Sequence, residues 1–494
     1  MVVSPVSPQA QDDAPDIIRI VSVFRTLTLD PIKSVFTGSI ETFGQLYTRL
    51  LRRDTDGRLV PGLALRWEIS ADGLDYTFFL RAARFSDGSP ITADDVAFSL
   101  LRMRDDPEAA YSAPVTSMQD AWAEDEHTLR VRLDIPNAPF LEALEMCFLG
   151  VVSRADVERR GAVAAFADIP VTSGPYRVVE WRRNDRLILE ANPYYWREGY
   201  PRNDGAELIE VVDVNTRIAM LRAGEADAVR VITYSSISAL ATHPDITVPA
   251  EPAIRINLLL LNHDRPPFSD RRVREAAALA LEMQRITKVL TRGRARPANT
   301  LLPYQLRFYD PDFPGWPYDP ERARQLIDAA GASGSEVTIN ITAPDTVWEM
   351  MALILQAYWA EIGLKVRIQK MDQALYEQRL IDGDYDASVE WWYNENTDPD
   401  LAVKWALCGS CGNRAYYTNY QNDRIDKLVQ LGVSELDPDK RRDIYREIQS
   451  IAFHDVAQIP LYYQPWLNAY STRIDGLRLT PATQWTLEEA HHVR

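Results

Sequence analysis

Apolar and polar residues follow two different rhythms along the chain, and together they indicate a mixed α/β protein. Residues 17–23 (IIRIVSV) form a short β-branched run that predicts a buried strand, whereas residues 127–133 (HTLRVRL) alternate as a half-buried strand does. Between residues 346 and 362, apolar side chains recur every three or four positions, which predicts a helix packed on a core.

A βαβ unit is predicted between residues 209 and 232. Residues 209–214 predict a strand, Asn215 is a candidate helix N-cap, and Gly224 suits the end of that helix. Residues 228–232 then predict a second strand, and such a unit favours a sheet covered by helices. Other helices are predicted where a capping residue precedes an apolar stripe, at Thr92, Asp270, Asp319 and Asp437.

Length and composition indicate a multidomain protein of ordinary globular character. A chain of 494 residues, 46% of them hydrophobic, is too long for one compact core, so two or three domains are expected. Acidic residues number 71 against 54 basic ones, and the formal charge of −17 repels nucleic acid and anionic membranes. No apolar run reaches the roughly 18–20 residues that span a bilayer.

The first 16 residues predict a disordered lead-in, because Pro, Ser, Gln and Asp dominate them. They lack the basic start and the long apolar stretch of a secretory signal. Two interpretations follow: the protein is cytoplasmic, or a signal has been removed from it.

The cysteines and histidines do not predict a metal centre. Cys408 and Cys411 have C-x-x-C spacing, which suits a local disulfide, two buried thiols or half of a zinc site. Of the six histidines, only the neighbours His491 and His492 are paired in sequence. We therefore expect no metal and no cofactor.

No familiar catalytic constellation is present. The chain contains no G-x-G-x-x-G, G-x-x-x-x-G-K-[ST], G-x-S-x-G or H-E-x-x-H motif. Carboxylate pairs such as Asp382 and Asp384 are abundant in so acidic a protein, and turns or solvated faces explain them more simply than a glycosidase pair does. We expect a binding protein and no enzyme.

Several short motifs follow one another in a familiar order. They are residues 61–64 (PGLA), 85–96 (FSDGSPITADDV), 172–176 (TSGPY), 192–196 (NPYYW), 267–274 (PFSDRRVR), 318–323 (YDPERA), 383–387 (GDYDA), 398–400 (DPD) and 459–462 (IPLY). The series resembles the extracellular solute-binding proteins of family 5, the peptide, opine and nickel group of ABC importers. The resemblance extends from about residue 20 to residue 475.

The resemblance implies a periplasmic-binding-protein-like α/β fold with two main lobes around a hinged ligand cleft and an inserted third lobe. Lobe I combines residues 17–45, 172–260 and 464–494, lobe II is an insertion over 46–171, and lobe III covers 261–463. The resemblance further implies hinge segments near 260–262 and 463–466 and an oxidised Cys408–Cys411 pair. Lobes I and III would close over a ligand that does not react.

The stretch 390–400 (EWWYNENTDPD) places three aromatic side chains directly before an acidic turn, and the resemblance implies that it lines the cleft. In peptide-binding relatives an Asp after the Trp pairs with the ligand ammonium, and the corresponding residue here is Glu395. Strand alternation lets only one of Trp391 and Trp392 face the cleft, and we expect Trp392, with Tyr393 nearby. The alternative is that this Trp packs into the core. The remaining candidate contacts are Asn394, Asp398, Phe36 and Thr37, with Arg255 and Arg414 as candidates for a ligand carboxylate.

These inferences predict the periplasmic substrate-binding component of an ABC importer, a monomer that delivers its ligand to a permease in the inner membrane. The expected ligand is a short peptide or an amino-acid conjugate such as an opine. A galactoside-like oligosaccharide is the second ligand class to consider, because paired indoles suit a sugar face. A hydrolase or a cytoplasmic sensor built on the same fold would also suit the sequence, though less well.

Overall fold

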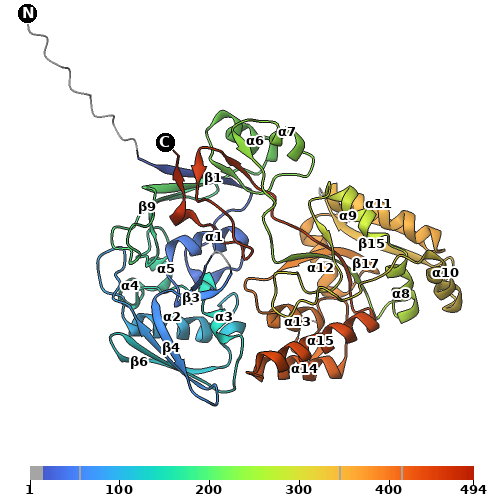
Figure 1. Cartoon of the computed structure of the whole chain (residues 1–494), viewed down its shortest axis with the longest axis horizontal. Helices are drawn as coiled ribbons and strands as arrows, with labels where there is room; N and C mark the ends of the chain where they lie inside the picture. Colours follow the sequence, from blue (N-terminus) through green and yellow to red (C-terminus); the bar gives the residue numbers. More distant parts are fainter. Residues whose placement is uncertain (1–14, 55–56, 344–345, 413–414, 494) are drawn as a thin grey trace, which may run out of the picture.

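The computed structural model describes residues 15–54, 57–343, 346–412 and 415–493. Three sheets organise this part of the chain, with seven, four and six strands. Figure 1 shows the yellow and orange elements of the six-stranded sheet beside the blue and green elements of the other two. Lobes I, II and III denote the residue sets defined above, except that residues 255–260 belong with lobe III, because they form strand β13 of the six-stranded sheet.

The seven-stranded sheet combines segments from both ends of the chain. In spatial order its strands are β12 (Ile246–Thr247), β19 (Ala469–Ser471), β11 (Ala228–Val229), β1 (Ile17–Ser22), β10 (Gly205–Glu210), β9 (Arg186–Ala191) and β8 (Tyr176–Arg182). β1 runs parallel to both β10 and β11, and the other pairings are antiparallel. Its helices are α1 (Thr37–Leu46), α6 (Val214–Ala223) and α7 (Ile237–Ala241).

The predicted βαβ unit is present as β10, α6 and β11, with three corrections. The first strand is residues 205–210 and not 209–214, because the chain leaves the sheet after Glu210 and α6 already begins at Val214. The N-cap of α6 is Asp213 and not Asn215, because the Asp213 carboxylate accepts a hydrogen bond from the Thr216 backbone N–H at 2.8 Å. The second strand ends at Val229, since Val231 takes a left-handed φ of 58° that turns the chain out of the sheet.

The four-stranded sheet is antiparallel and lies within lobe II. Its strands are β4 (Ala64–Ile69), β5 (Asp75–Leu80), β7 (Thr128–Leu133) and β6 (Met118–Asp125), accompanied by the hairpin of β2 (Leu51–Arg53) and β3 (Leu59–Pro61). The helices are α2 (Ala93–Asp105), α3 (Phe140–Ala143), α4 (Arg154–Arg160) and α5 (Ala162–Ala165). The alternating run predicted at 127–133 is β7. The backbone N–H of Thr92 donates to the Asp95 side chain at 2.9 Å and fixes the start of α2.

The six-stranded sheet carries most of the helices. Its strands are β14 (Arg296–Pro297), β18 (Ile459–Tyr463), β13 (Arg255–Leu261), β17 (Ala387–Tyr393), β15 (Glu336–Thr342) and β16 (Lys365–Met371). The helices are α8 (Arg271–Leu279), α9 (Met283–Leu290), α10 (Pro320–Ala329), α11 (Thr346–Glu361), α12 (Gln373–Asp382), α13 (Asp400–Leu407), α14 (Asp423–Ser434) and α15 (Pro438–Asp455). The helix predicted at 346–362 is α11, which packs on β15 and β16.

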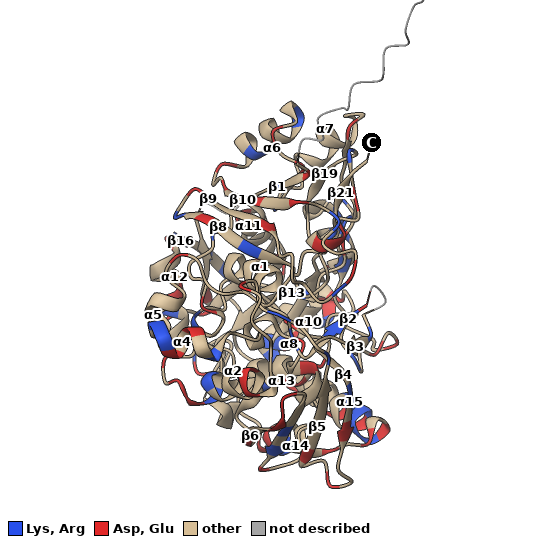
Figure 2. Ribbon diagram, turned by 90° about the vertical axis from the view of Figure 1, so that its left-hand side faces the viewer, with Lys and Arg blue, Asp and Glu red and all other residues tan. Residues whose placement is uncertain are grey.

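Short elements complete the described chain. They are the 3₁₀ turns η1 (Pro31–Lys33), η2 (Ala113–Val115), η3 (Cys147–Leu149), η4 (Gly409–Cys411) and η5 (Leu487–Glu489), and the strand pair β20 (Ile474–Asp475) and β21 (His491–His492). No helix within the described ranges is both long and apolar enough to cross a bilayer. Figure 2 shows the positions of acidic and basic residues interspersed along the ribbon.

Two large apolar cores divide the molecule. One core is continuous between the seven-stranded and four-stranded sheets, and includes Phe43 and Tyr47 of the α1 region together with Phe78 of β5. The other core belongs to the six-stranded sheet, with Trp359 and Leu258 among its fully buried members. Lobes I and II are therefore one packed unit, and lobe III is a second.

Two short segments carry the chain between these units. Residues 248–254 lead from β12 to β13, and residues 464–468 lead from β18 back to β19. The segments touch each other, because the Trp466 backbone N–H donates to the Glu251 carbonyl at 2.9 Å. The hinge predicted at 260–262 instead falls at the end of β13, inside the six-stranded sheet, and the first crossing comes earlier in the chain.

Replacement of the buried Trp359 should destabilise lobe III. The indole is fully buried, and its Nε1–H donates to the Ala277 carbonyl at 3.1 Å. We expect Trp359→Ala to lower the free energy of unfolding by about 3–5 kcal/mol through cavity formation and loss of the hydrogen bond. Urea denaturation followed by circular dichroism tests this, with Trp122→Ala as control because Trp122 is 42% exposed. Equal effects of the two substitutions would contradict the assigned core.

Candidate functional site

Strand alternation in β17 separates the two tryptophans of the aromatic stretch. The rings of Trp391 and Tyr393 stack on one face with centroids 5.8 Å apart, and the Arg255 guanidinium carbon lies 4.1 Å from the Trp391 ring. Trp392 lies on the opposite face, because successive side chains of a strand point to opposite sides. The expected grouping of Trp392 with Tyr393 is thus corrected: the tryptophan beside Tyr393 is Trp391. Both indoles are half-buried.

Tyr393 connects this strand to lobe I. A hydrogen bond joins its hydroxyl to the Thr37 side chain at the start of α1, and its ring centroid lies 6.4 Å from that of Trp466. Phe36, the N-cap of α1, is 41% exposed and meets the Phe24 ring edge-on at 6.3 Å. The sequence candidates Thr37 and Tyr393 therefore meet between the two packed units, whereas Phe36 contacts Phe24 of its own unit.

Glu395 follows β17 directly and is half-buried. Burial raises its pKa to about 7, because the surroundings favour the neutral acid over the carboxylate. No ion pair to Glu395 occurs among the residues that the structure describes. Burial is the main cause that raises the pKa of Tyr393 in lobe III and of Tyr111 in lobe II. The negative charge of Glu395 is the second cause for both. The carboxylate therefore lies where lobe III meets lobe II.

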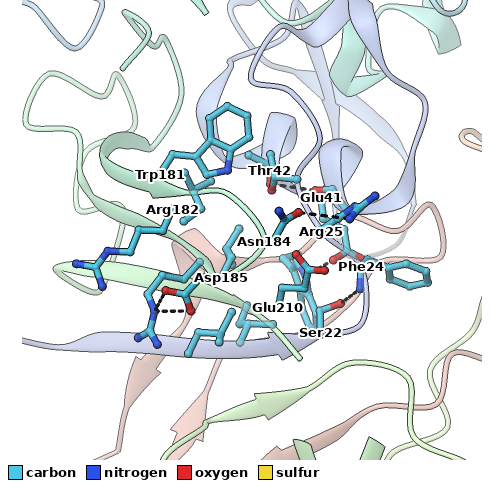
Figure 3. Close-up of a pocket in the computed structure, with 18 residues that line it drawn as sticks. Ser22, Phe24, Arg25, Glu41, Thr42, Trp181, Arg182, Asn184, Asp185 and Glu210 are labelled. Atoms are coloured by element: carbon cyan, nitrogen blue, oxygen red, sulfur yellow. Dashed lines mark hydrogen bonds and ion pairs between the residues drawn. The ribbon is translucent and has the colours of Figure 1, made fainter. Parts of the chain in front are cut away.

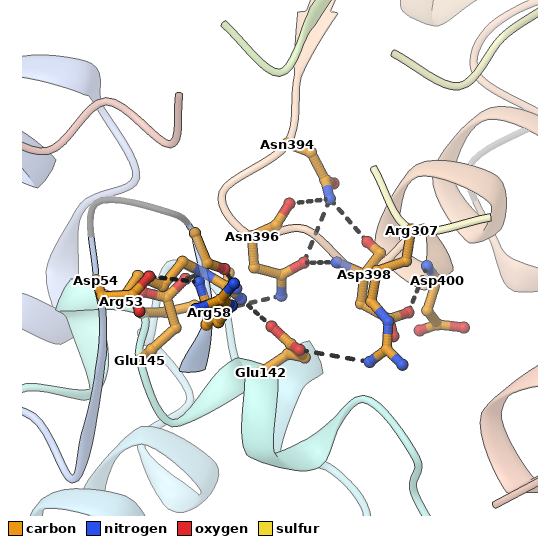
Figure 4. A network of polar contacts seen from close by, with 12 residues as sticks. Arg53, Asp54, Arg58, Glu142, Glu145, Arg307, Asn394, Asn396, Asp398 and Asp400 are labelled. Atoms are coloured by element: carbon orange, nitrogen blue, oxygen red, sulfur yellow. Dashed lines mark hydrogen bonds and ion pairs between the residues drawn. The ribbon is translucent and has the colours of Figure 1, made fainter. Parts of the chain in front are cut away.

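The loop that carries Glu395 is braced from within. The Asn394 side chain donates to the carbonyls of Asn396, at 2.8 Å, and Asp398, at 2.9 Å (Figure 4). The Asp398 carboxylate accepts from both terminal nitrogens of Arg441 on α15, at 2.7 and 3.0 Å, and both side chains are almost fully buried. Asn394 and Asp398 thus fix the shape of the loop.

Arg230 is a member of the site that the sequence reasoning missed. It follows β11, is fully buried, and its Nε–H donates to the Glu41 carboxylate of α1 at 2.8 Å. Its guanidinium carbon lies 4.2 Å from the Trp466 ring, while that of Arg255 lies 5.7 Å from the same ring. The signal available in the sequence was an arginine inside the apolar run ADAVRVI. Arg414, the other arginine candidate, lies outside the described residues.

A small pocket lies beside α1 at the edge of the seven-stranded sheet (Figure 3). Ser22 and Glu210 are the last residues of the parallel strands β1 and β10 and line it, and the carboxyl ends of such strands are the usual ligand edge of an α/β sheet. Phe24 and Glu41 belong both to this pocket and to the surroundings of Arg230. The cavity of about 30 Å³ has room for about two water molecules, so it is too small to hold a peptide.

Two of the three cysteines form a disulfide in lobe III. Cys408 and Cys411 are joined in a disulfide directly after α13, with Cα atoms 5.4 Å apart. Cys147 is buried as a free thiol, and burial raises its pKa to about 12. No group of three or more His, Cys, Asp or Glu side chains in the described ranges is arranged to hold a metal ion.

Comparison with known proteins gives a consistent result. A family model described as bacterial extracellular solute-binding proteins, family 5 Middle, matches residues 58–413, which is more than half of the chain. The di/tripeptide-binding protein 2 of Pseudomonas aeruginosa is 29% identical over 451 residues, covering 86% of this chain and 84% of that protein. The glutathione-binding protein GsiB of Salmonella typhimurium is 28% identical over 480 residues, covering 94% and 92%.

A solved structure supports the same fold. The periplasmic binding protein DppA of Helicobacter pylori, in complex with the peptide STSA, superposes with a TM-score of 0.83. The two chains are 23% identical, and the match covers 97% of this chain and 98% of the other. At this identity the likeness shows the fold alone.

Loss of the Arg441 side chain should disorganise the loop. Arg441→Leu leaves the buried Asp398 carboxylate without its cation, and we expect it to lower the free energy of unfolding by about 3–5 kcal/mol. Arg442→Leu is the matched control, because Arg442 is the next residue of α15 and pairs with Asp439 at the exposed surface. Chemical denaturation measures the free energy of unfolding of both variants. If Arg441→Leu lowers it no more than the control does, the Asp398–Arg441 pair does not stabilise the loop.

Proposed function

This chain belongs to the bacterial extracellular solute-binding proteins of family 5, and we propose that it captures a short peptide between lobes I and III for an ABC importer. Relatives named for di/tripeptide and glutathione binding support this ligand class. The protein acts in the periplasm as a monomer and presents its closed form to a membrane permease. No bond of the ligand changes in this cycle.

The observation that carries the proposal is the state of Glu395. Its carboxyl group is half-buried, its pKa is raised to about 7, and no cation of the described chain pairs with it. A peptide α-ammonium supplies the missing charge and restores the carboxylate form, since an opposite charge within hydrogen-bond reach stabilises the ionised acid. The ligand ammonium therefore forms with Glu395 the ion pair that the described part of the chain does not supply.

The rest of the ligand lies along aromatic surfaces. The Tyr393 and Trp466 rings are 6.4 Å apart, and an extended dipeptide spans roughly 7 Å, so two or three residues reach past both rings. Arg255, placed over Trp391, is the proposed partner of the ligand carboxylate. Trp391, on the same face of β17 as Tyr393, is the proposed contact for a ligand side chain, whereas Trp392 on the other face packs against the lobe III core. A mostly aromatic wall with few charged groups is the usual construction of a small-molecule site.

Closure follows from the division of the cores. Lobe III has an apolar core of its own and is attached through residues 248–254 and 464–468. Tyr393 already lies against Thr37 of α1 in the structure, so rotation about these two segments would separate the facing surfaces and admit a ligand without disturbing either core. The ligand contributes contacts to both sides and so favours the closed state.

A binding experiment on Glu395 also distinguishes two other ligand classes. An opine retains charged amino-acid groups and can use Glu395 as a peptide does. A galactoside-like oligosaccharide could stack on the indoles but would leave the Glu395 carboxyl group without a cation. Ligand charge therefore distinguishes the proposals.

Blocking the ligand ammonium or neutralising Glu395 should weaken binding. We expect N-acetylation of a tight-binding di- or tripeptide, or the substitution Glu395→Gln, to raise Kd by at least about tenfold, the equivalent of 1.4 kcal/mol. Isothermal titration calorimetry on a panel of alanine-based peptides measures this. Glu377→Gln is the control, because Glu377 is an exposed carboxylate of α12. Tight binding of a neutral galactoside, or equal affinity for free and acetylated peptides, would overturn the peptide assignment.

Peptide affinity should depend on pH through Glu395. Only the carboxylate attracts the ammonium, and the pKa near 7 in the ligand-free protein means that affinity is low below pH 7 and increases as pH rises through it. We expect Kd to fall about fivefold between pH 6 and pH 7.5, before the peptide amine itself starts to lose its proton near pH 8. Calorimetry across this range should show a flat profile for Glu395→Gln. A flat profile in the unsubstituted protein would place the ammonium elsewhere.

A further inference from the structure

Lobe II touches the same loop that carries Glu395. The Asn396 side-chain amide, one residue after Glu395, lies 3.8 Å from the Met146 sulfur of lobe II. A backbone hydrogen bond of 2.8 Å runs from the Ala138 N–H of lobe II to the Val433 carbonyl of α14. Lobe II therefore contacts lobe III through these two interactions. It also shares an apolar core with lobe I.

Charged side chains reinforce this contact. Arg53 of β2 donates to Glu142 and also to Glu145, the latter at 2.8 Å, and all three side chains are largely buried. Arg307 reaches across from lobe III and lies 3.6 Å from the Glu142 carboxylate. Since Arg53 is shared between two acids, Arg307 supplies a second cation to Glu142. Figure 4 shows Arg307 and Arg53 on either side of Glu142.

Arg307 is also tied to the loop through its backbone. Its N–H donates to the Thr397 carbonyl at 2.8 Å, two residues after Glu395. One residue therefore links the Glu395 loop, by its main chain, to lobe II, by its guanidinium. The side chain of Arg307 is 45% exposed, so the ion pair is accessible to salt.

We propose that lobe II is a third wall of the ligand cleft and that Arg307 is a positioning residue that locks this wall against the Glu395 loop. The proposal rests on the proposed peptide site. With the Arg307–Glu142 contact formed, Met146 and Tyr111 of lobe II close the side of the cleft next to Glu395. Release of the ligand then requires lobe II to separate from the loop, so the contact slows dissociation.

The test compares Arg307→Met with Arg424→Met. Arg424 forms an exposed ion pair with Glu447 between α14 and α15, at 2.7 Å, entirely within lobe III, and is the matched control. We expect Arg307→Met to raise the peptide dissociation rate about two- to fivefold at low salt, the range of an exposed ion pair, and the control to leave it unchanged. At 0.5 M salt the difference between Arg307→Met and the unsubstituted protein should largely disappear.

A double-mutant cycle identifies the partner. Glu142→Gln should raise the dissociation rate as Arg307→Met does, and the double variant should be no faster than the more affected single one, because both changes break one contact. Both variants should fold, since Glu142 keeps Arg53 in Arg307→Met, and Arg53 keeps Glu145 in Glu142→Gln. Additive effects, or equal rates in Arg307→Met and Arg424→Met, would overturn the proposal.

Hydrogen exchange in the ligand-free protein provides a second test of the Arg307–Glu142 contact that requires no peptide. Faster amide exchange over residues 394–398 in Arg307→Met than in Arg424→Met is expected. If no peptide binds the unsubstituted protein, the proposed function is wrong. The hydrogen-exchange comparison then still tests whether the Arg307–Glu142 contact stabilises the loop. If peptides bind through Glu395 and both arms show no effect of Arg307→Met, only the role of lobe II fails.

Discussion

The architecture depends on keeping two apolar cores apart. Residues 248–254 and 464–468 are the crossings between the unit formed by lobes I and II and the unit formed by lobe III, and the Glu251–Trp466 backbone hydrogen bond holds them together. If the facing surfaces were purely aliphatic, they would merge into one core and the cleft would be lost. The facing surfaces instead carry Tyr393, Trp466 and arginines, which pack against each other and still present polar atoms to a ligand.

The carboxylates at residues 395–400 differ in whether they have a cationic partner. Asp398 has Arg441 as its partner, whereas burial raises the pKa of Glu395 and of Asp400 to about 7. A folded-state pKa above the ordinary value makes the ligand-free fold less stable as pH rises from the usual carboxyl range toward 7. In the proposed complex, a ligand ammonium at Glu395 would reverse the sign of that contribution. The paired acid Asp398 maintains the loop, and Glu395 would then link stability to ligand binding.

Sequence reasoning reached the fold because periodicity and caps act locally. The apolar spacing of α11 and the Asp319 cap of α10 depend on neighbouring residues, and both were predictable. The partner of Tyr393 was misjudged as Trp392, although residues two apart in a strand share a face. Arg230 was missed because its role comes from Glu41 and Trp466, which are distant in sequence. The hinge expected at 260–262 lies at the end of strand β13, because the apolar run that precedes it pairs within the six-stranded sheet and the chain crosses earlier, at residues 248–254.

The rigidity of the Glu395 loop has a consequence for affinity. Asn394 and the Asp398–Arg441 pair hold the loop on its lobe III side whether or not a ligand is present, so the carboxylate is positioned in advance and little ordering is required on binding. In the proposed complex, lobe I faces the ligand from the side opposite to the Glu395 loop. Discrimination between ligands of equal charge would then come from the lobe I surface, because the Glu395 loop is already fixed and would treat every ammonium alike.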